Sequence, residues 1–439
     1  MSTTAAAQET QASEASEAPT NPKPTIDIAS LVSRDNMQRA FAAVKSNKGS
    51  AGIDGKTIAQ TATHLVTHWR KIRQTLHAGH YQPAAVRAVS IPKANGGTRQ
   101  LGIPSVQDRL IQQAMQQLLT PTFDPLMSNN SYGFRPNRSA HDAIEAATSY
   151  VKQGRKWVVD IDLKQYFDQV SHDRLIHMLK PHISDKQILA LIGRYLRAPM
   201  RHNDGSQQPR QRGTPQGGPL SPLLANIYLD PLDKELEKRG IAFVRYADDI
   251  AIFTSSERSA KRILASVKEW LHKQLDLEIN DDKSGVSMCN KTQLLGFCIH
   301  PNGDVSIATK ALEKLKVRVR ELWDGRQSLT TPELRDQWRS YIIGWWNYFE
   351  YANDRSGVHK LSGWIRRHMR KCFWLRWHNR AGRRKALRRL GVRGRSLQVA
   401  GCRRGAWAMS IHVVMNQALK TTTLAAFGFV LPWTLAGKQ

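Results

Sequence analysis

Acidic residues interrupt two apolar runs of the sequence, and their spacing suggests metal chemistry. In the first run Asp160 and Asp162 stand two residues apart, so their side chains leave the same face of a β-strand. In the second run Asp248 and Asp249 are adjacent, at a tight reversal between two apolar strands. Acids at a hairpin tip usually serve only as turn formers. Two carboxylates on one strand face, however, require a cation, and Mg²⁺ prefers carboxylate oxygen.

Nucleotidyl transfer is a reaction that such a group of aspartates can support. It needs a primer 3′-hydroxyl made nucleophilic and a triphosphate whose charge is neutralised, and two Mg²⁺ ions roughly 3.5–4 Å apart supply both. Because Mg²⁺ keeps part of its shell for water and substrate phosphate, two or three aspartates from two strands suffice. Carboxylates brought this close would repel one another and take up protons if the metals were absent. The acids and their metals are therefore expected to be interdependent.

The hydrophobic pattern predicts the elements that position these acids. A β-rich run covers 157–163, and a hairpin of two apolar strands covers 243–253. A second hairpin is expected at 86–101, with Gly96 and Gly97 in its loop. Strands and helices follow one another without an internal repeat or a regular β-α-β alternation, which favours an α+β fold over a doubly wound sheet. Helical spacing predicts helices near 37–44, 107–119, 310–323, 338–349 and 364–377.

The charge balance indicates a polyanionic partner. The chain has 65 Lys and Arg against 36 Asp and Glu, a formal net charge of +29, so nucleic acid is the leading candidate. Much of the excess lies in 361–439, which holds 17 Lys or Arg and no Asp or Glu. A solvated tail would lack the Trp, Leu and Ile of this segment. We therefore expect a folded, basic, nucleic-acid-binding domain there.

Two of the predicted helices carry aromatic or basic faces. The helix near 338–349 places six large side chains on one face, and a position in the protein core is favoured over a base-stacking platform. These side chains are Trp338, Tyr341, Ile342, Trp345, Trp346 and Phe349. The helix near 364–377 sets core-spaced residues against a basic face that we expect to meet phosphate. That basic face consists of Arg366, Arg367, Arg370 and Lys371.

Composition also excludes several classes of protein. The four cysteines stand too far apart for a Cys-x-x-Cys zinc pattern and are too few for a disulfide framework: Cys289, Cys298, Cys372 and Cys402. No apolar run reaches the length of a membrane span, and the start lacks the features of a signal peptide. We expect a cytoplasmic protein without a membrane partner, and a disordered tail over residues 1–25.

Short motifs follow one another along the chain. They are Ser50-Ala51-Gly52-Ile53-Asp54-Gly55, Ile91-Pro92-Lys93, Arg99-Gln100-Leu101-Gly102-Ile103-Pro104, Tyr132-Gly133-Phe134-Arg135-Pro136, Gly213-Thr214-Pro215-Gln216-Gly217-Gly218-Pro219-Leu220-Ser221-Pro222, Tyr246-Ala247-Asp248-Asp249 and Leu294-Leu295-Gly296-Phe297. In this order, and with the Asp162 strand among them, they resemble the motifs of the reverse transcriptase family. The resemblance is most specific to the bacterial group II intron reverse transcriptase/maturases, and it extends more loosely to the C-terminus.

This resemblance implies roles for individual residues. Asp162 and Asp248 become the principal metal ligands, with Asp249 completing a catalytic cluster that holds two Mg²⁺ ions. Phe167, five positions after Asp162, matches the aromatic residue that blocks a ribose 2′-hydroxyl. Asp160 lies one pleat back, about 6.6 Å along the strand, and is the weaker candidate, with a polar strand edge as its plain role.

Four further residues are implied to bind the incoming nucleotide. Lys93 and Arg99 resemble the residues that clasp the triphosphate, for which Lys gives a compact charge and Arg a bidentate fork. Gln216 resembles the residue that lies against the nascent base pair. Lys283 resembles the lysine that protonates the leaving pyrophosphate, although an ordinary surface lysine would give the same pattern.

The resemblance also implies the organisation of the chain. The expected fold is a right-hand polymerase with a disordered tail at 1–25, fingers and palm at 26–304, thumb helices at 305–360 and a basic helical maturase region at 361–439. The expected partners are group II intron RNA, a DNA target and primer, and deoxynucleoside triphosphates; the oligomeric state stays open. The chain ends at Gln439 without suitable cysteines, so no zinc-containing endonuclease domain is expected, and a primer would come from elsewhere, such as a replication fork.

Three functions compete at this point. The first is an active reverse transcriptase that also assists splicing of its intron. The second is a reverse transcriptase of a defence or retron-like system, against which the C-terminal block argues. The third is a splicing-only RNA-binding maturase, against which the intact Asp162, Asp248 and Asp249 argue.

Overall fold

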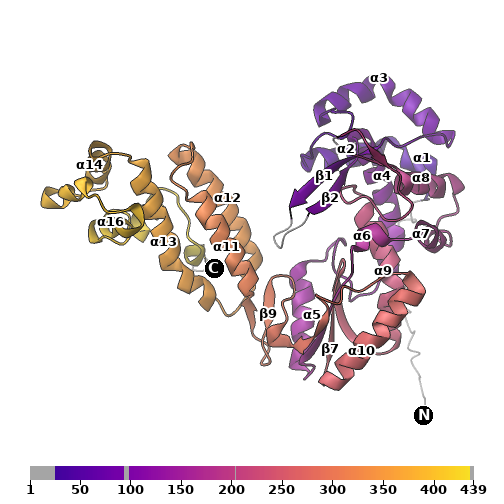
Figure 1. Ribbon diagram of the computed structural model, residues 1–439. Helices are drawn as coiled ribbons and strands as arrows, with labels where there is room; N and C mark the ends of the chain where they lie inside the picture. The colour runs from indigo at the N-terminus through magenta and orange to yellow at the C-terminus, as the bar shows by residue number, and fades with distance from the viewer. Residues whose placement is uncertain (1–24, 93–97, 203, 436–439) are drawn as a thin grey trace, which may run out of the picture. The chain divides into compact units, whose positions relative to one another are not determined.

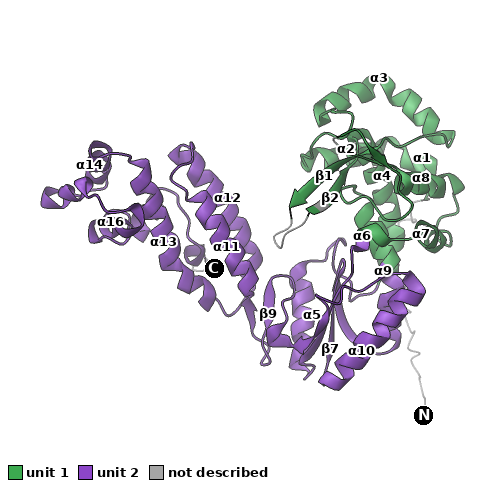
Figure 2. Cartoon of the chain, viewed as in Figure 1, with its two compact units in different colours: residues 1–127, 167–228 green, residues 128–166, 229–439 purple. Residues whose placement is uncertain are grey.

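The computed structural model describes residues 25–92, 98–202 and 204–435 of the chain. These residues form two compact units, one of residues 1–127 and 167–228, the other of residues 128–166 and 229–439 (Figure 2). The prediction of a disordered tail over 1–25 falls, except for Thr25, outside the described residues. The predicted loop with Gly96 and Gly97 lies outside them as well.

The first unit contains a group of packed helices and a small sheet with the strand order β2-β1-β4-β5. Its elements are α1 (Ile28–Leu31), α2 (Arg34–Ser46), α3 (Ile58–His77), β1 (Val86–Pro92), β2 (Thr98–Ile103), α4 (Val106–Phe123), η1 (Asp124–Leu126), α7 (His172–Leu179), α8 (Lys186–Arg197), β4 (Met200–Arg201) and β5 (Gln207–Gln208). The chain passes between the units within α6 (Tyr166–Gln169) and α9 (Ser221–Lys238).

Two predictions for this unit are confirmed. Strands β1 and β2 form the expected antiparallel hairpin, with register from Arg87 opposite Ile103 to Pro92 opposite Thr98. Helix α4 buries all six apolar residues of the predicted periodic pattern: Leu110, Ile111, Ala114, Met115, Leu118 and Leu119.

The second unit is built on an antiparallel sheet that contains β7 (Figure 1). The strand order of this sheet is β6-β7-β3-β8. Its strands are β3 (Trp157–Asp162), β6 (Ala242–Tyr246), β7 (Asp249–Thr254) and β8 (Gly285–Met288). Helices α5 (Ala140–Lys152) and α10 (Glu257–Trp270) pack on it, and the π-helical turn η2 (Leu271–Leu275) and the 3₁₀ turn η3 (Cys289–Lys291) follow. Both predicted acid-bearing strand regions are therefore confirmed, as is the α+β class.

Successive residues of these strands face opposite sides of the sheet. On one side Val158, Val244 and Phe253 pack with Ile144 and Ala147 of α5 in a shared apolar core. The same core takes in Phe297 of the small hairpin β9 (Phe297–Ile299) and β10 (Val305–Ile307), and Trp346 and Phe349 of the following helices. The sheet and the first part of the helical region are thus joined by one continuous core.

The helical remainder of this unit has a second core. Its elements are α11 (Thr309–Leu322), α12 (Thr331–Phe349), α13 (Ser356–Arg376), α14 (Arg380–Arg389), η4 (Gly394–Gly401), α15 (Ala406–Met409), α16 (Val413–Ala418), α17 (Thr421–Ala426) and α18 (Pro432–Leu435). The aromatic stripe of α12 is buried at Trp338, Ile342, Trp346 and Phe349, which confirms the core reading over the stacking platform. None of the helices among the described residues is long and apolar enough to cross a membrane.

Candidate active site

Two of the predicted catalytic acids lie opposite each other in the antiparallel sheet. Asp162, the last residue of β3, pairs with Asp249, the first residue of β7. Directly opposed residues in such a ladder point to the same face, with Cβ atoms about 4.5–5.5 Å apart. Asp160 is two residues back on β3 and pairs with Ala251, so it shares this face. The register therefore gathers three carboxylates at one end of one sheet face.

The fourth acid, Asp248, lies in the turn that joins β6 to β7. Tyr246 pairs with Asp249, which leaves Ala247 and Asp248 as a two-residue connection. Ala247 has φ 58°, in the left-handed region that residues with a Cβ atom rarely adopt. Asp248 itself is half-buried. The tight reversal thus places Asp248 next to the Asp162–Asp249 pair.

The backbone of Asp162 is fixed by a loop that precedes β8. The Ser284 hydroxyl accepts a hydrogen bond from the Asp162 amide at 2.9 Å, and the Asn280 amide donates to the Asp162 carbonyl at 2.8 Å. The same loop brings the Lys283 Nζ to 3.5 Å from Asp162 Oδ2. Both side chains keep contact with solvent, so this ion pair contributes little stability and leaves Lys283 accessible.

Burial and the neighbouring carboxylates raise the pKa values of two of these acids, Asp160 and Asp249. Partial burial, reinforced by the charge of Asp162, raises the pKa of Asp160 to about 6. The pKa of Asp249 is also raised to about 6, first by loss of water around its carboxyl group and then by the charges of Asp248, Asp160 and Asp162. This is the repulsion that the sequence predicts for a metal-free acidic cluster.

The donor set fits a hard divalent cation. Among the described residues, no group of three or more His, Cys, Asp and Glu side chains is arranged to hold a metal ion. Mg²⁺ does not require one, because it is usually bound by one or two carboxylates and retains water and substrate phosphate as further ligands. Carboxylates with raised pKa values near the solvent-accessible end of one sheet face would regain their charge as a cation neutralises them.

Asp160 has a different place from the polar strand edge that the sequence suggests. Strand β3 lies inside the sheet, between β7 and β8, so Asp160 is an interior residue of the ladder. Opposite it on β8 stands Gly285, and a Cβ atom placed there would meet no atom within 4 Å. Open space therefore adjoins the Asp160 carboxyl. Gly285 is far from Asp160 in the sequence, so only the strand pairing shows that a residue without a side chain lies opposite Asp160.

The remaining predicted nucleotide ligands belong to the first unit and are described within it. The Phe167 carbonyl accepts a hydrogen bond from the Thr214 amide at 2.6 Å, and the Gln216 carbonyl accepts one from the Gly102 amide at 2.9 Å. Gly217 has φ 133°, and a Cβ atom there would lie 2.7 Å from the Gly102 carbonyl oxygen, so glycine is required. Lys93 and the side chain of Arg99 lie outside the described residues.

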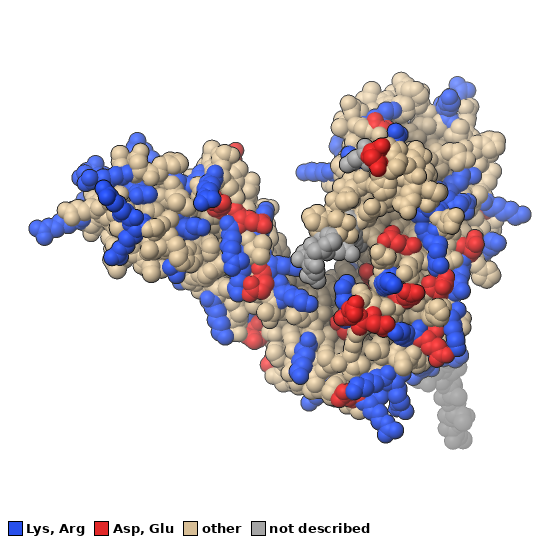
Figure 3. All heavy atoms as spheres, viewed as in Figure 1, with Lys and Arg blue, Asp and Glu red and all other residues tan. Residues whose placement is uncertain are grey.

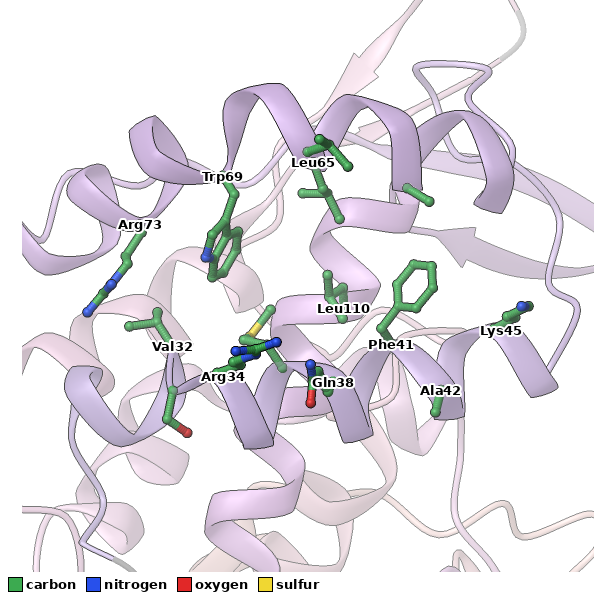
Figure 4. A pocket seen from close by; sticks show the side chains of 14 residues that line it. Val32, Arg34, Gln38, Phe41, Ala42, Lys45, Leu65, Trp69, Arg73 and Leu110 are labelled. Carbon is green, nitrogen blue, oxygen red and sulfur yellow. The ribbon is translucent and has the colours of Figure 1, made fainter.

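The first unit also contains a large apolar groove between α2 and α3 (Figure 4). Its volume is about 1000 Å³. Phe41 and Gln38 line it from α2, and Leu65 and Trp69 line it from α3. No carboxylate is among its lining residues, so the groove offers none of the ligands that metal chemistry needs.

The predicted RNA-binding arginines of α13 make contacts within the protein. Arg366 Nη1 donates to Thr421 Oγ1 at 2.8 Å, Arg367 Nε to Ser410 Oγ at 3.1 Å, and Arg370 Nε to the Leu419 carbonyl at 3.1 Å. The Arg367 guanidinium also stacks 3.8 Å from the centroid of the Trp407 ring. Three of the four predicted residues thus tie α13 to the C-terminal segment, whereas Lys371 is half-exposed without such a contact among the described residues.

Exposed basic residues gather instead on α14 and the segment after it, which sequence reasoning did not single out. Figure 3 shows Lys and Arg without Asp or Glu over this part of the visible face, in agreement with the absence of any acid after Asp354 in the sequence. The exposed basic residues are Arg380, Arg384, Lys385, Arg388, Arg389, Arg393, Arg395, Arg403 and Arg404. We refer to this set as the α14 surface. The arginine-rich stretch Arg383-Arg384-Lys385 was the signal that could have found it.

Comparison with known families gives two consecutive matches. The family described as reverse transcriptase (RNA-dependent DNA polymerase) matches residues 91–299, and the group II intron maturase-specific domain matches residues 312–391. The first match contains all four acids of the cluster. The second contains α12, α13 and α14.

Individual relatives, which match 56–69% of this chain, agree with these matches. YkfC of Escherichia coli K12 is 32% identical over 286 residues, covering 56% of this chain and 74% of YkfC. The group II intron-encoded protein LtrA of Lactococcus lactis subsp. cremoris is 30% identical over 372 residues, covering 69% of this chain and 60% of LtrA. A putative COX1/OXI3 intron 1 protein of Saccharomyces cerevisiae is 28% identical, and the matched region spans 41% of it.

The order of the two domains agrees with the paired acids on the sheet and the basic helical region that follows them. A reverse transcriptase of a defence or retron-like system would not account for the maturase-specific match. The chain therefore belongs to the family of group II intron-encoded reverse transcriptase/maturases, which are RNA-directed DNA polymerases that take part in intron splicing.

Proposed function

We propose that this protein copies its group II intron RNA into DNA at the cluster of Asp162, Asp248 and Asp249, with two Mg²⁺ ions held by these carboxylates. Bound there, the ions would activate the primer 3′-hydroxyl and neutralise the triphosphate of the incoming deoxynucleotide. The single observation that carries this proposal is the register that sets Asp162 opposite Asp249, with Asp248 in the adjoining turn.

The chain's own residues take complementary parts in the reaction. The three aspartates hold the ions at the solvent-accessible end of one sheet face. Lys283, whose Nζ lies 3.5 Å from Asp162 Oδ2, donates a proton to the pyrophosphate as its bond to the α-phosphorus breaks. Phe167 excludes a ribose 2′-hydroxyl, Gln216 lies against the nascent pair, and Lys93 and Arg99 bind the triphosphate.

Primer extension tests the metal ligands. Asp162→Asn and Asp248→Asn each keep the side-chain shape and remove the charge, so each should lower Mg²⁺-dependent extension of a DNA primer on an RNA template at least 1000-fold, about 4 kcal/mol of transition-state stabilisation. Asp204→Asn, which alters an exposed aspartate of the first unit, should extend like wild type. Extension by Asp248→Asn within tenfold of wild type would refute the assignment.

The RNA-binding part of the proposal rests on charge. The α14 surface, together with Lys371 of α13, neutralises phosphates of the folded intron by shape and charge, without reading sequence. Arg366, Arg367 and Arg370 contribute to RNA binding indirectly, because they hold the C-terminal segment on α13. Intron RNA, a DNA target and primer, and deoxynucleotides are the partners, and the work takes place in the cytoplasm, where these nucleic acids meet.

A further inference from the structure

A buried ion pair adjoins the turn that carries Asp248. The side chains of Arg245 and Asp233 are both completely buried. Arg245 Nε donates to Asp233 Oδ1 at 2.8 Å, and Arg245 Nη2 donates to Asp233 Oδ2 at 2.5 Å. Because neither group reaches water, each depends on the other for neutralisation, and the pair fixes β6 to α9.

The third nitrogen of this guanidinium holds the turn itself. Arg245 Nη1 donates to the carbonyl of Ala247 at 3.0 Å. Ala247 is the residue with φ 58°, a conformation that its Cβ atom disfavours. A hydrogen bond to its carbonyl offsets that strain and fixes the peptide that leads directly into Asp248. The buried pair therefore acts on the orientation of a metal ligand.

Arg245 does not itself belong to the acidic face. In the β6–β7 ladder Tyr246 pairs with Asp249, whereas Arg245 pairs with Ile250, so Arg245 points to the opposite side of the sheet. It cannot coordinate the ions or contact the nucleotide from there. The hydrogen bond to the Ala247 carbonyl links Arg245 to the turn that carries Asp248, which makes Arg245 a positioning residue.

A second constraint on the same turn comes from Gly133. A Cβ atom at this position would lie 2.9 Å from the carbonyl carbon of Tyr246 and closer still to the Ala247 nitrogen, both of them backbone atoms. The Gly133 segment is fixed alongside β6, because the Tyr132 amide donates to the Arg245 carbonyl at 2.8 Å and the Arg245 amide to the Asn130 carbonyl at 2.9 Å. The turn is therefore confined between this segment and the guanidinium.

We propose that Arg245, held by Asp233, and Gly133 are positioning residues that set the geometry of the Ala247–Asp248 turn and, through it, the divalent-cation affinity of the site. The inference rests on the proposed function of Asp248 as a metal ligand. Lysine cannot replace Arg245, because one ammonium group on a flexible stem cannot bridge a carboxylate and a carbonyl in a fixed fork.

Mn²⁺ binding to the full-length protein, measured by electron paramagnetic resonance without nucleic acid or nucleotide, tests the inference. Arg245→Lys and Gly133→Ala should each raise the Mn²⁺ dissociation constant at least fivefold. Ile252→Ala is the matched control, because Ile252 is fully buried in β7 on the same sheet face as Arg245 but away from the turn. It should lower the melting temperature and leave Mn²⁺ binding within twofold of wild type.

Kinetics give a second readout that general destabilisation would not produce. In Arg245→Lys, kcat for primer extension should fall at least tenfold with the KM for template-primer unchanged, and a higher Mn²⁺ concentration should restore most of the lost kcat.

Wild-type Mn²⁺ affinity in both Arg245→Lys and Gly133→Ala, with Asp248→Asn deficient, would overturn this inference alone. Wild-type Mn²⁺ affinity in Asp248→Asn would overturn the proposed function. An equal loss in Ile252→Ala would assign the effect to stability and also overturn the inference.

Discussion

Removing positive charge from the α14 surface should weaken RNA binding and should make the RNA affinity less dependent on salt concentration. Arg384, Arg388 and Arg389 are exposed, and none makes an ion pair with another described residue. Each phosphate contact contributes about 0.7–0.9 to the slope of log affinity against log salt, so Arg384→Ala/Arg388→Ala/Arg389→Ala should lower that slope by about 2 to 3. A change of about 2 makes the loss of affinity between 50 and 200 mM salt about 16-fold smaller.

The assay is filter binding or fluorescence anisotropy with intron RNA across that salt range. A matched control removes three lysines that are each paired with an acid in the second unit, by Lys261→Ala/Lys268→Ala/Lys273→Ala. Both variants lose the same charge, so a purely long-range effect of net charge would lower the slope equally in both. That result, or an unchanged slope in the α14 variant, would refute the reasoning.

Three further predictions concern stability. Trp338 and Trp323 are fully buried in one core, but Trp338 Nε1 donates to the Val430 carbonyl at 2.6 Å, whereas Trp323 Nε1 has no partner among the described residues. Trp338→Phe should therefore cost about 1–3 kcal/mol more than Trp323→Phe in denaturant unfolding, and equal costs would contradict this. Burial and nearby cations lower the pKa of His368 to about 4 from 6.5. The unfolded state therefore takes up a proton before the folded state does, so the free energy of unfolding should be unaffected by this group above pH 6.5 and should decline as the pH falls toward 4. His368→Gln should flatten that decline in denaturant midpoints between pH 7 and 4.5, and an undiminished decline in this variant would exclude His368 as its source. The buried Asp108 carboxylate accepts four hydrogen bonds, so Asp108→Ala should lower the protection of α4 in hydrogen exchange, and unchanged protection would count against this role.

The strands and the acids they carry could be predicted because their signals are local. Alternation with a period of two placed Asp160 and Asp162 on one face, and the apolar runs around Asp248 and Asp249 marked a hairpin. The pairing of Asp162 with Asp249 joins residues 87 positions apart, which no local pattern specifies. Their juxtaposition could be expected only from the resemblance to a family.

Other features could not be read from the sequence because they depend on distant partners. Arg245 looks like an ordinary polar residue of a strand, and only its contact with Asp233 of α9 shows that it is buried. The arginines of α13 looked free to meet phosphate, since nothing in their own helix indicates acceptors 43 to 55 residues later. Local periodicity assigns a residue to a face, but tertiary packing decides what covers that face.

The contacts that fix α13 to the end of the chain employ hydroxyl and carbonyl oxygens in place of carboxylates. These hydrogen bonds use N–H donors of the arginines but cancel none of their positive charge. The guanidinium groups of this region therefore still repel one another in the RNA-free protein. A bound polyanion would relieve that repulsion. The free protein should accordingly melt at a lower temperature in dilute buffer than in the presence of RNA or moderate salt, so that the intron transcript acts as a stabiliser of the very protein that assists its splicing.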